Sequence, residues 1–218
     1  GGGGGTSYST STVAAGGGGA GGLIFLPNQI IPPDEYIIKV GKGGAGDIHT
    51  DTTQPQRGKN GNNSSFNYLL TEAIGGGGGG SREGVNAGNI GGSGGGSSWI
   101  DTVPGSLSGE LTIGGLGTIT DLVKNDGTVI IPNYQQGFKG GDSIGGPVDN
   151  QPFCGGGGGA GEAGYGSFVP DDNDHLDANG GNGLASQNGY NFQTYFNITD
   201  TSIGEHNNSL VYFAGGGA

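Results

Sequence analysis

Short apolar runs, separated by turn residues and by blocks of glycine, form the dominant pattern of the chain. Residues 23–31 and 36–40 are apolar and rich in β-branched and aromatic side chains, and Pro32-Pro33-Asp34-Glu35 lies between them. Because proline and aspartate are typical turn residues, the two runs are predicted to form a hairpin. Helical spacing of apolar residues (i, i+3, i+4, i+7) does not extend over a dozen residues free of Gly or Pro.

A second hairpin is predicted from residues 118–123 and 128–131. Asp126-Gly127 lies in the connection between them, and this pair readily adopts the positive φ angles of a tight turn. The even spacing of the apolar runs predicts an all-β fold, a β-sandwich of the jelly-roll type. Further strands are predicted at 66–74, 111–113, 190–198 and 210–213.

Glycine accounts for 57 of the 218 residues and is concentrated in blocks such as 75–80 and 155–159. Collagen is excluded because glycine does not recur at every third position. The blocks are interpreted either as flexible linkers or as polyproline-II-like polyglycine strands packed side by side. Six residues at ~3.1 Å rise span ~19 Å, the length of an ordinary strand, which favours ordered strands for the internal blocks. For 1–5 and 215–217 both interpretations stay open.

The formal net charge is −12, from 19 acidic and 7 basic residues, and every Lys or Arg lies at or before Lys139. A nucleic-acid-binding protein needs a basic surface, so nucleic acid is excluded as a partner. No run approaches the ~20 apolar residues of a membrane helix, so membrane insertion is not expected. The chain begins with Gly1 and contains no Met, so a processed or partial chain is expected.

Residues typical of catalysis are sparse. The three histidines and Cys154 lack the spacing of a metal or nucleophile motif. We therefore expect a protein that is not an enzyme and needs no cofactor. Cys154, beside Phe153 and a glycine block, is interpreted as a small buried apolar residue.

One acidic loop has the oxygen ligands that Ca²⁺ prefers. It departs from the EF-hand pattern, because His175 stands at the third ligand position and no Gly follows at the sixth. The alternative is a solvated polar loop. Asp47, His49 and Asp51 alternate and are interpreted as a solvent-facing polar edge. The candidate calcium ligands are Asp171, Asp172, Asp174 and Asp177.

Two further kinds of candidate site come from local sequence. The N-x-S/T pattern predicts N-glycosylation if the chain passes through a eukaryotic secretory route. The uncharged, β-prone stretch 6–13 is predicted to pair with a sheet edge of a neighbouring subunit, the alternative being a frayed tail. The glycosylation candidates are Asn62, Asn63, Asn197 and Asn207, and the assembly candidates are Thr6, Tyr8, Thr10 and Thr12.

Three segments together resemble a known family. They are the strand and glycine motif at 35–46, the Asn-Ser-Ser-Phe region continuing into the glycine block at 60–80, and the closing segment 210–217. They resemble the glycine-rich domain of phage tail-fibre and large-DNA-virus proteins. The resemblance covers residues 1–97 and the C-terminal edge. It implies a β-sandwich carrying polyglycine helices, located extracellularly or on a virion surface.

The resemblance and the composition lead to one expected organisation. Residues 1–22 form a glycine-rich N-terminal segment, and 23–218 form a single glycine-rich β domain in which 98–150 is an insertion. The expected function is a structural subunit that self-assembles into an extracellular filament or virion fibre. The alternative is a fibre-tip adhesin that binds a receptor or glycan, and ice binding is a third class. Aromatic candidates for the adhesin are Trp99, Tyr134, Tyr165, Phe168 and Tyr190.

Overall fold

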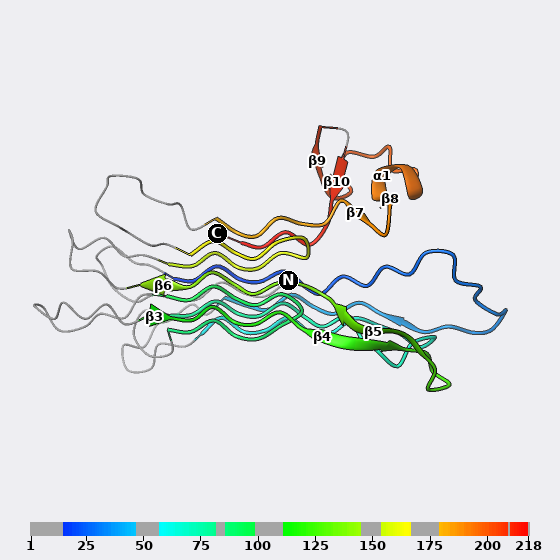
Figure 1. The fold of residues 1–218 in the computed structure, drawn as a ribbon, viewed down its shortest axis with the longest axis horizontal. Helices are drawn as coiled ribbons and strands as arrows, with labels where there is room; N and C mark the ends of the chain where they lie inside the picture. The colour runs from blue at the N-terminus through cyan, green and yellow to red at the C-terminus, as the bar shows by residue number, and fades with distance from the viewer. Residues whose placement is uncertain are drawn as a thin grey trace, which may run out of the picture.

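The fold is built from extended segments that lie side by side along the long axis of the molecule (Figure 1). This computed structural model describes residues 15–46, 57–81, 86–98, 111–144, 154–166, 179–208 and 210–217. Within these ranges, helix is confined to α1 (Phe192–Tyr195). The chain is therefore held together mainly by contacts between extended backbones.

The segment 93–98 lies at the centre of this arrangement. Its six consecutive N–H groups donate to three neighbouring segments in strict rotation, over N···O distances of 2.7 to 3.1 Å. From Ser93 to Ser98, the acceptors are the carbonyls of Ala20, Phe138, Asn89, Gly17, Gly141 and Asn86. A rotation with a period of three residues is what an extended helix of three residues per turn produces.

The carbonyls of the same segment bond to three other segments. They accept, in order from Ser93 to Ser97, from the N–H groups of Gly77, Gly158, Gly115, Gly80 and Gly155. The segment 93–98 is thus hydrogen-bonded on all sides, with six segments around it. We call this arrangement of laterally bonded extended segments the glycine lattice.

The segment 155–160 has an equally complete environment. Its successive N–H groups donate in turn to the carbonyls of three neighbouring segments. The acceptors are Ser97 and Gly94 on the first, Tyr165 and Glu162 on the second, and Gly217 and Ala214 on the third. Its carbonyls accept from 17–20, 138–141 and Gly181. Both 75–80 and 155–160 are buried throughout, so the interpretation of the internal glycine blocks as ordered strands is confirmed. Residues 215–217 belong to the lattice as well, since Gly216 donates to Gly181 and Gly217 to Gly18.

Short strands lie at the ends of the lattice segments and form two-stranded antiparallel sheets. The pairs are β1 (Ile38–Lys39) with β2 (Ser65–Phe66), β3 (Leu111–Thr112) with β6 (Ser143–Ile144), β4 (Ile119–Val123) with β5 (Val129–Gln135), β7 (Ser186–Gln187) with β8 (Tyr190–Asn191), and β9 (Glu205–Asn207) with β10 (Leu210–Tyr212). The all-β class is confirmed for the described residues. The described residues show no closure of these pairs into a sandwich.

The hairpin predicted around Asp126-Gly127 is confirmed. Gly127 has φ 87°, a left-handed conformation that glycine adopts without strain. The Thr128 N–H donates to the Asp126 carboxylate at 2.8 Å. This hydrogen bond is the main reason that the pKa of Asp126 lies below its ordinary value. β4 and β5 project beyond the lattice as the longest strands described (Figure 1).

The hairpin predicted from 23–31 and 36–40 is wrong. Residues 23–31 form no strand, and β1 pairs with β2 instead. The aromatic side chains of the two runs have different partners: Phe25 packs on Phe192 at 4.9 Å between ring centroids, whereas Tyr36 packs on Phe66 at 5.3 Å. Apolar residues that a hairpin would have covered stay in solvent, Ile30 being 90% exposed.

Two other strand predictions hold only in part. In 66–74, only the beginning is a strand, and isolated bridges follow at Leu69 and Ala73. In 190–198, β8 ends at Asn191 and α1 follows. The Asn191 side chain accepts a hydrogen bond from the Thr194 N–H at 3.2 Å, which is the geometry of a helix N-cap. The strand 210–213 is confirmed as β10.

Large side chains form a small core at one end of the lattice. Phe25 and Phe192 are buried within an aromatic cluster of the C-terminal region. Gln136, only 1% exposed, connects its own segment to 72–74: its side-chain oxygen accepts from the Ile74 N–H, and its side-chain nitrogen donates to the Glu72 carbonyl, each at 2.9 Å. In the part of the chain that the structure describes, no helix is long and apolar enough to cross a membrane.

Candidate functional site

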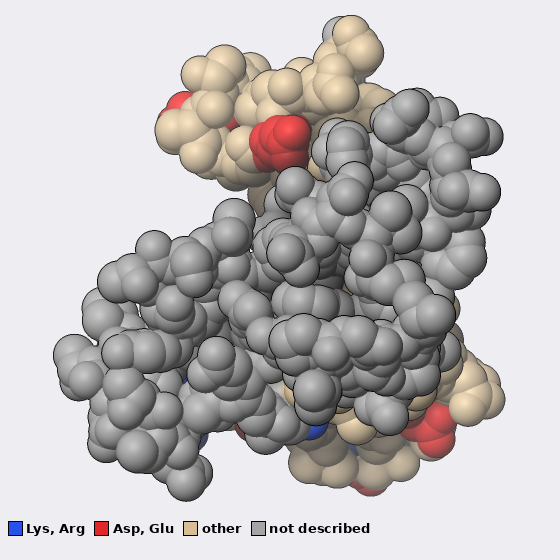
Figure 2. Space-filling view, turned by 90° about the vertical axis from the view of Figure 1, so that its left-hand side faces the viewer, with Lys and Arg blue, Asp and Glu red and all other residues tan. Residues whose placement is uncertain are grey.

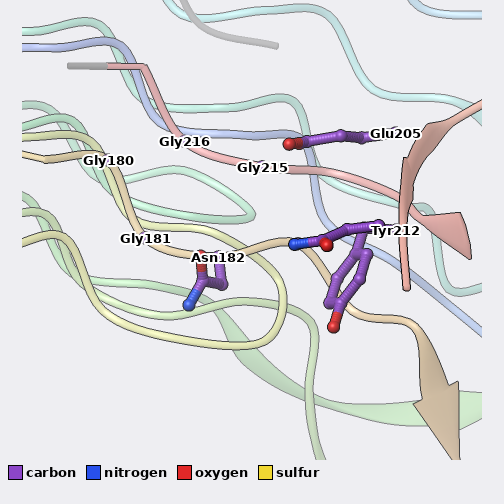
Figure 3. A pocket seen from close by; sticks show the side chains of 9 residues that line it. Gly180, Gly181, Asn182, Glu205, Tyr212, Gly215 and Gly216 are labelled. Atoms are coloured by element: carbon purple, nitrogen blue, oxygen red, sulfur yellow. The ribbon is translucent and has the colours of Figure 1, made fainter. Parts of the chain in front are cut away.

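A groove of about 280 Å³ lies where the β9–β10 hairpin meets the edge of the glycine lattice (Figure 3). One wall carries the side chains of Glu205, Asn207 and Tyr212. The opposite wall is formed by 180–183 and by 215–216. We call this feature the C-terminal groove.

The pairing of β9 with β10 explains why three polar side chains share one wall. Tyr212 stands opposite Glu205 in the antiparallel register. Asn207 is two residues from Glu205, so it points to the same face of the strand. The intervening register position pairs His206 with Val211, which is fully buried on the other face. The apolar core thereby holds the polar face of the hairpin toward the lattice.

The opposite wall offers backbone rather than side chains. A Cβ placed on Gly215 would meet a single heavy atom within 4 Å, the Gly183 nitrogen at 3.7 Å. This contrasts with Gly216, where a Cβ would be 2.7 Å from the Gly157 carbonyl carbon. The lattice is therefore closely packed beneath Gly216 and open above Gly215, so a ligand in the groove can approach the backbone closely.

The remaining side chain of the groove, Asn182, is held by a neighbour. Its Nδ2 donates to Glu162 Oε2 at 2.6 Å, and Tyr165 donates its hydroxyl to Glu162 Oε1 at 2.5 Å. The hydrogen bond to the Glu162 carboxylate, followed by the charge of that carboxylate, raises the pKa of Tyr165 above its ordinary value. Glu162 thus fixes the orientation in which Asn182 meets the groove.

A second, more open groove of about 530 Å³ lies between 70–74 and 118–123. Its two sides are tied together, because Thr71 Oγ1 donates to the Asp121 carbonyl at 2.7 Å and accepts from the Val123 N–H at 2.8 Å. Its lining mixes the apolar side chains of Leu70, Ile74 and Val123 with polar ones, whereas the C-terminal groove is lined by polar side chains and glycine backbone. The C-terminal groove is therefore the better candidate site.

The sequon asparagines lie on the surface, two of them next to each other in the sequence. Asn62, Asn63, Asn197 and Asn207 are all exposed. Asn63 already uses both ends of its amide, donating to Glu72 Oε2 at 2.7 Å and accepting from the Gly75 N–H at 3.0 Å. Asn207 lines the C-terminal groove. Glycosylation stays a prediction. It predicts a mass above that of the bare polypeptide after secretion from eukaryotic cells, and an intact mass equal to the polypeptide would contradict it.

The other predicted site residues lie outside the described residues. This holds for the calcium candidates Asp171, Asp172, Asp174 and Asp177, for Asp47, His49 and Asp51, and for the assembly candidates Thr6, Tyr8, Thr10 and Thr12. Among the residues that are described, no group of three or more His, Cys, Asp or Glu side chains could hold a metal ion. Calcium binding and N-terminal strand pairing stay predictions.

The aromatic candidates that are described have structural partners. Tyr134 is buried, and its hydroxyl accepts from the Phe25 N–H at 3.0 Å and donates to Gln187 Oε1 at 2.9 Å. The Tyr190 hydroxyl accepts from Asn28 Nδ2 at 2.6 Å. Trp99 and Phe168 lie outside the described ranges. Cys154 is half-buried, with its Sγ 4.0 Å from Ser98 Oγ.

Sequence reasoning named Asn207 only as a glycosylation candidate and missed the other residues of the C-terminal groove. The sequence does carry a local signal for the hairpin wall of the groove. Glu205 and Asn207 are two residues apart, as side chains on one face of a strand are, and Tyr212 follows after a short connection. Asn208 has φ 49°, consistent with a tight hairpin turn. The sequence gives no such signal for the wall formed by the lattice, because glycine has no side chain that would indicate which segment packs beside it.

Together, these observations define a class of protein: a lattice of hydrogen-bonded extended glycine segments that carries hairpins and a polar groove at one end. A family model described as a glycine-rich domain matches residues 1–218. The chain therefore belongs to this glycine-rich domain family. The match gives no link to phage tail-fibre or large-DNA-virus proteins, so that part of the resemblance stays a prediction. Comparisons with curated proteins and with solved structures found no match.

Proposed function

We propose that the protein is a non-enzymatic structural subunit that self-associates, as part of an extracellular filament or of a fibre on a virion surface. The glycine lattice supports a mechanical role. Hydrogen bonds leave 93–98 and 155–160 in several directions around each segment, so bending the rod in any direction distorts some of them. Such a lattice makes a stiff spacer that needs little side-chain volume.

The observation that carries self-association is a row of exposed aliphatic residues on the lattice. Ile113, Leu116 and Ile119 follow one another at intervals of three, and each is 55 to 60% exposed. Ile90, 62% exposed, lies on the adjacent segment, whose Gly88 and Gly91 N–H groups donate to the Ile113 and Leu116 carbonyls. We call these four residues the apolar stripe.

A second copy of this chain is the partner that fits the apolar stripe. With a net charge of −12, most faces of two copies repel each other. Figure 2 shows acidic side chains of the described residues at the upper and lower parts of one face. The segments 86–92 and 113–120 contain no charged residue, so contact along the stripe buries apolar area without opposing like charges. The repeat of three residues lets the side chains of one stripe fit between those of another.

Introducing a charge in the stripe is expected to weaken self-association. Leu116→Glu places a carboxylate where two copies would meet, and we expect at least a tenfold weaker dimer constant by sedimentation velocity. Val129→Glu is the matched control, since Val129 is also exposed but lies on the β4–β5 hairpin. The melting temperatures of both variants should match that of the wild type.

Two outcomes of this experiment would contradict the proposal. The first is a wild-type protein that stays monomeric at every accessible concentration. The second is an equal loss of association in both variants, which would indicate general charge repulsion rather than contact through the stripe. Electron microscopy of the native material then tests whether dimers build a periodic rod, for which the predicted N-terminal strand pairing would supply a further contact.

The C-terminal groove favours a second candidate function, a receptor- or glycan-binding adhesin at a fibre tip. A rigid lattice that carries a polar groove at its end is suited to presenting a binding site. An adhesin of this kind would bind cells or glycans as a discrete monomer or oligomer, whereas a filament subunit would assemble without ligand.

A further inference from the structure

The side chains of the C-terminal groove define which ligand chemistry it can accept. Figure 3 shows the Glu205 carboxylate directed toward 215–216 and the Tyr212 ring to the right of Asn182. Glu205 supplies acceptors, Asn207 supplies both donors and an acceptor, and Tyr212 supplies an aromatic face with a hydroxyl at its tip. These groups line one groove and face a wall of backbone N–H and C=O groups.

Several ligand classes do not fit this lining. An anionic ligand would meet the Glu205 carboxylate, and neither Lys nor Arg is among the described residues that line the groove. A calcium ion would need six to eight oxygen ligands, usually including several carboxylates, whereas Glu205 is the one carboxylate among the described residues of the lining. An apolar ligand would leave the polar groups of the hairpin and the lattice unpaired.

A neutral polyhydroxylated ring meets all of these conditions. Its hydroxyl groups can donate to the Glu205 carboxylate and can both donate to and accept from the Asn207 amide. Its C–H face can lie against the Tyr212 ring. A cavity of about 280 Å³ is close to the lower end of the ~300 to 1,000 Å³ range of ligand pockets, which suits one sugar residue better than a longer chain.

We propose that the C-terminal groove binds a single neutral sugar residue of a glycan. Glu205 and Asn207 hold the hydroxyl groups, and Tyr212 packs against the ring. Asn182, fixed by Glu162, closes the side of the groove formed by the lattice. The open space above Gly215 lets the sugar reach the backbone. This proposal rests on the second candidate function, whose ligand it specifies, and does not depend on self-association.

The experiment measures binding of free sugars to the full chain. Saturation-transfer NMR and titration calorimetry are carried out with D-glucose, D-galactose, D-mannose, L-fucose, N-acetylglucosamine and N-acetylgalactosamine, and with N-acetylneuraminic acid as the charged probe. At least one neutral sugar is expected to bind with a Kd in the millimolar range. Glu205→Gln keeps the shape of the side chain and is expected to weaken that binding at least tenfold, as is Tyr212→Ala.

Matched controls keep the result specific to the groove. Glu35→Gln removes an exposed carboxylate that is distant in sequence from the groove residues, and it should leave the Kd unchanged. Absence of binding by every neutral sugar, binding of the charged sugar alone, or equal binding by wild type and Glu205→Gln would each overturn the proposal. Repeating the titration with Leu116→Glu separates the two proposals, because sugar binding should persist when the apolar stripe is disrupted.

Discussion

Alanine at Gly95 is expected to destabilise the protein by about 3 kcal/mol or more, the upper end of the cost of overpacking a close-packed core. A Cβ there would contact the Gly78 carbonyl and lie 2.9 Å from the Gly79 nitrogen. Both are backbone groups of a segment bonded on several sides, so neither can move aside cheaply. For a chain of this size, the melting temperature should fall by roughly 6 to 12 °C for each 3 kcal/mol.

Gly215→Ala is the matched control for this substitution. It makes the same chemical change, but the nearest heavy atom to the new Cβ would be 3.7 Å away, which is ordinary contact. Thermal denaturation of both variants, followed by circular dichroism, should therefore separate them clearly. Gly77→Val provides a more severe test, because its Cβ would lie 2.7 Å from the Gly95 nitrogen. An unchanged melting temperature for Gly95→Ala or Gly77→Val would contradict the close packing of the lattice.

Leucine at Gln136 is expected to cost about 1 to 3 kcal/mol, because it removes two hydrogen bonds of a buried side chain, each worth ~0.5 to 1.5 kcal/mol. The Ile74 N–H and the Glu72 carbonyl both bond to the Gln136 side chain. Leucine has a similar volume, so the loss comes from unpaired polar groups rather than from a cavity. Chemical denaturation monitored by fluorescence measures the change in the free energy of unfolding.

Gln135→Leu is the control for the effect of leucine in this strand. Gln135 is exposed, and its side chain makes a long hydrogen bond of 3.3 Å to the Gly137 carbonyl. We expect a change within about 0.5 kcal/mol, as for ordinary surface substitutions. Similar losses in the two variants would show that Gln136 is not the polar connection between the segments.

The sequence was most informative where side chains and turn residues carry the structure. Asp126-Gly127 predicts the β4–β5 hairpin correctly because the turn chemistry is local. The purity and length of 75–80 correctly indicate an ordered segment. The all-β class follows from the near absence of helical spacing.

Long-range partners were the part that the sequence could not supply. Residues 23–31 look like half of a hairpin, yet Phe25 packs on Phe192, far along the chain. Asn191 ends a predicted strand by capping α1, and this competition between strand and cap is decided by tertiary packing. Within the lattice, one glycine segment resembles any other, so its neighbours are determined by the connections between segments rather than by side-chain recognition.

The period of three residues in the lattice also constrains how the length of this chain can vary. Gly77 and Gly80 donate to the same neighbour, at Ser93 and Gly96. Inserting one residue between them would turn everything that follows by a third of a turn and direct the second donor to a different segment. Inserting three would restore every direction and lengthen the segment by ~9 Å. The glycine blocks can therefore change in length by multiples of three residues without changing the neighbours of each segment. Rods of different lengths can then share one cross-section.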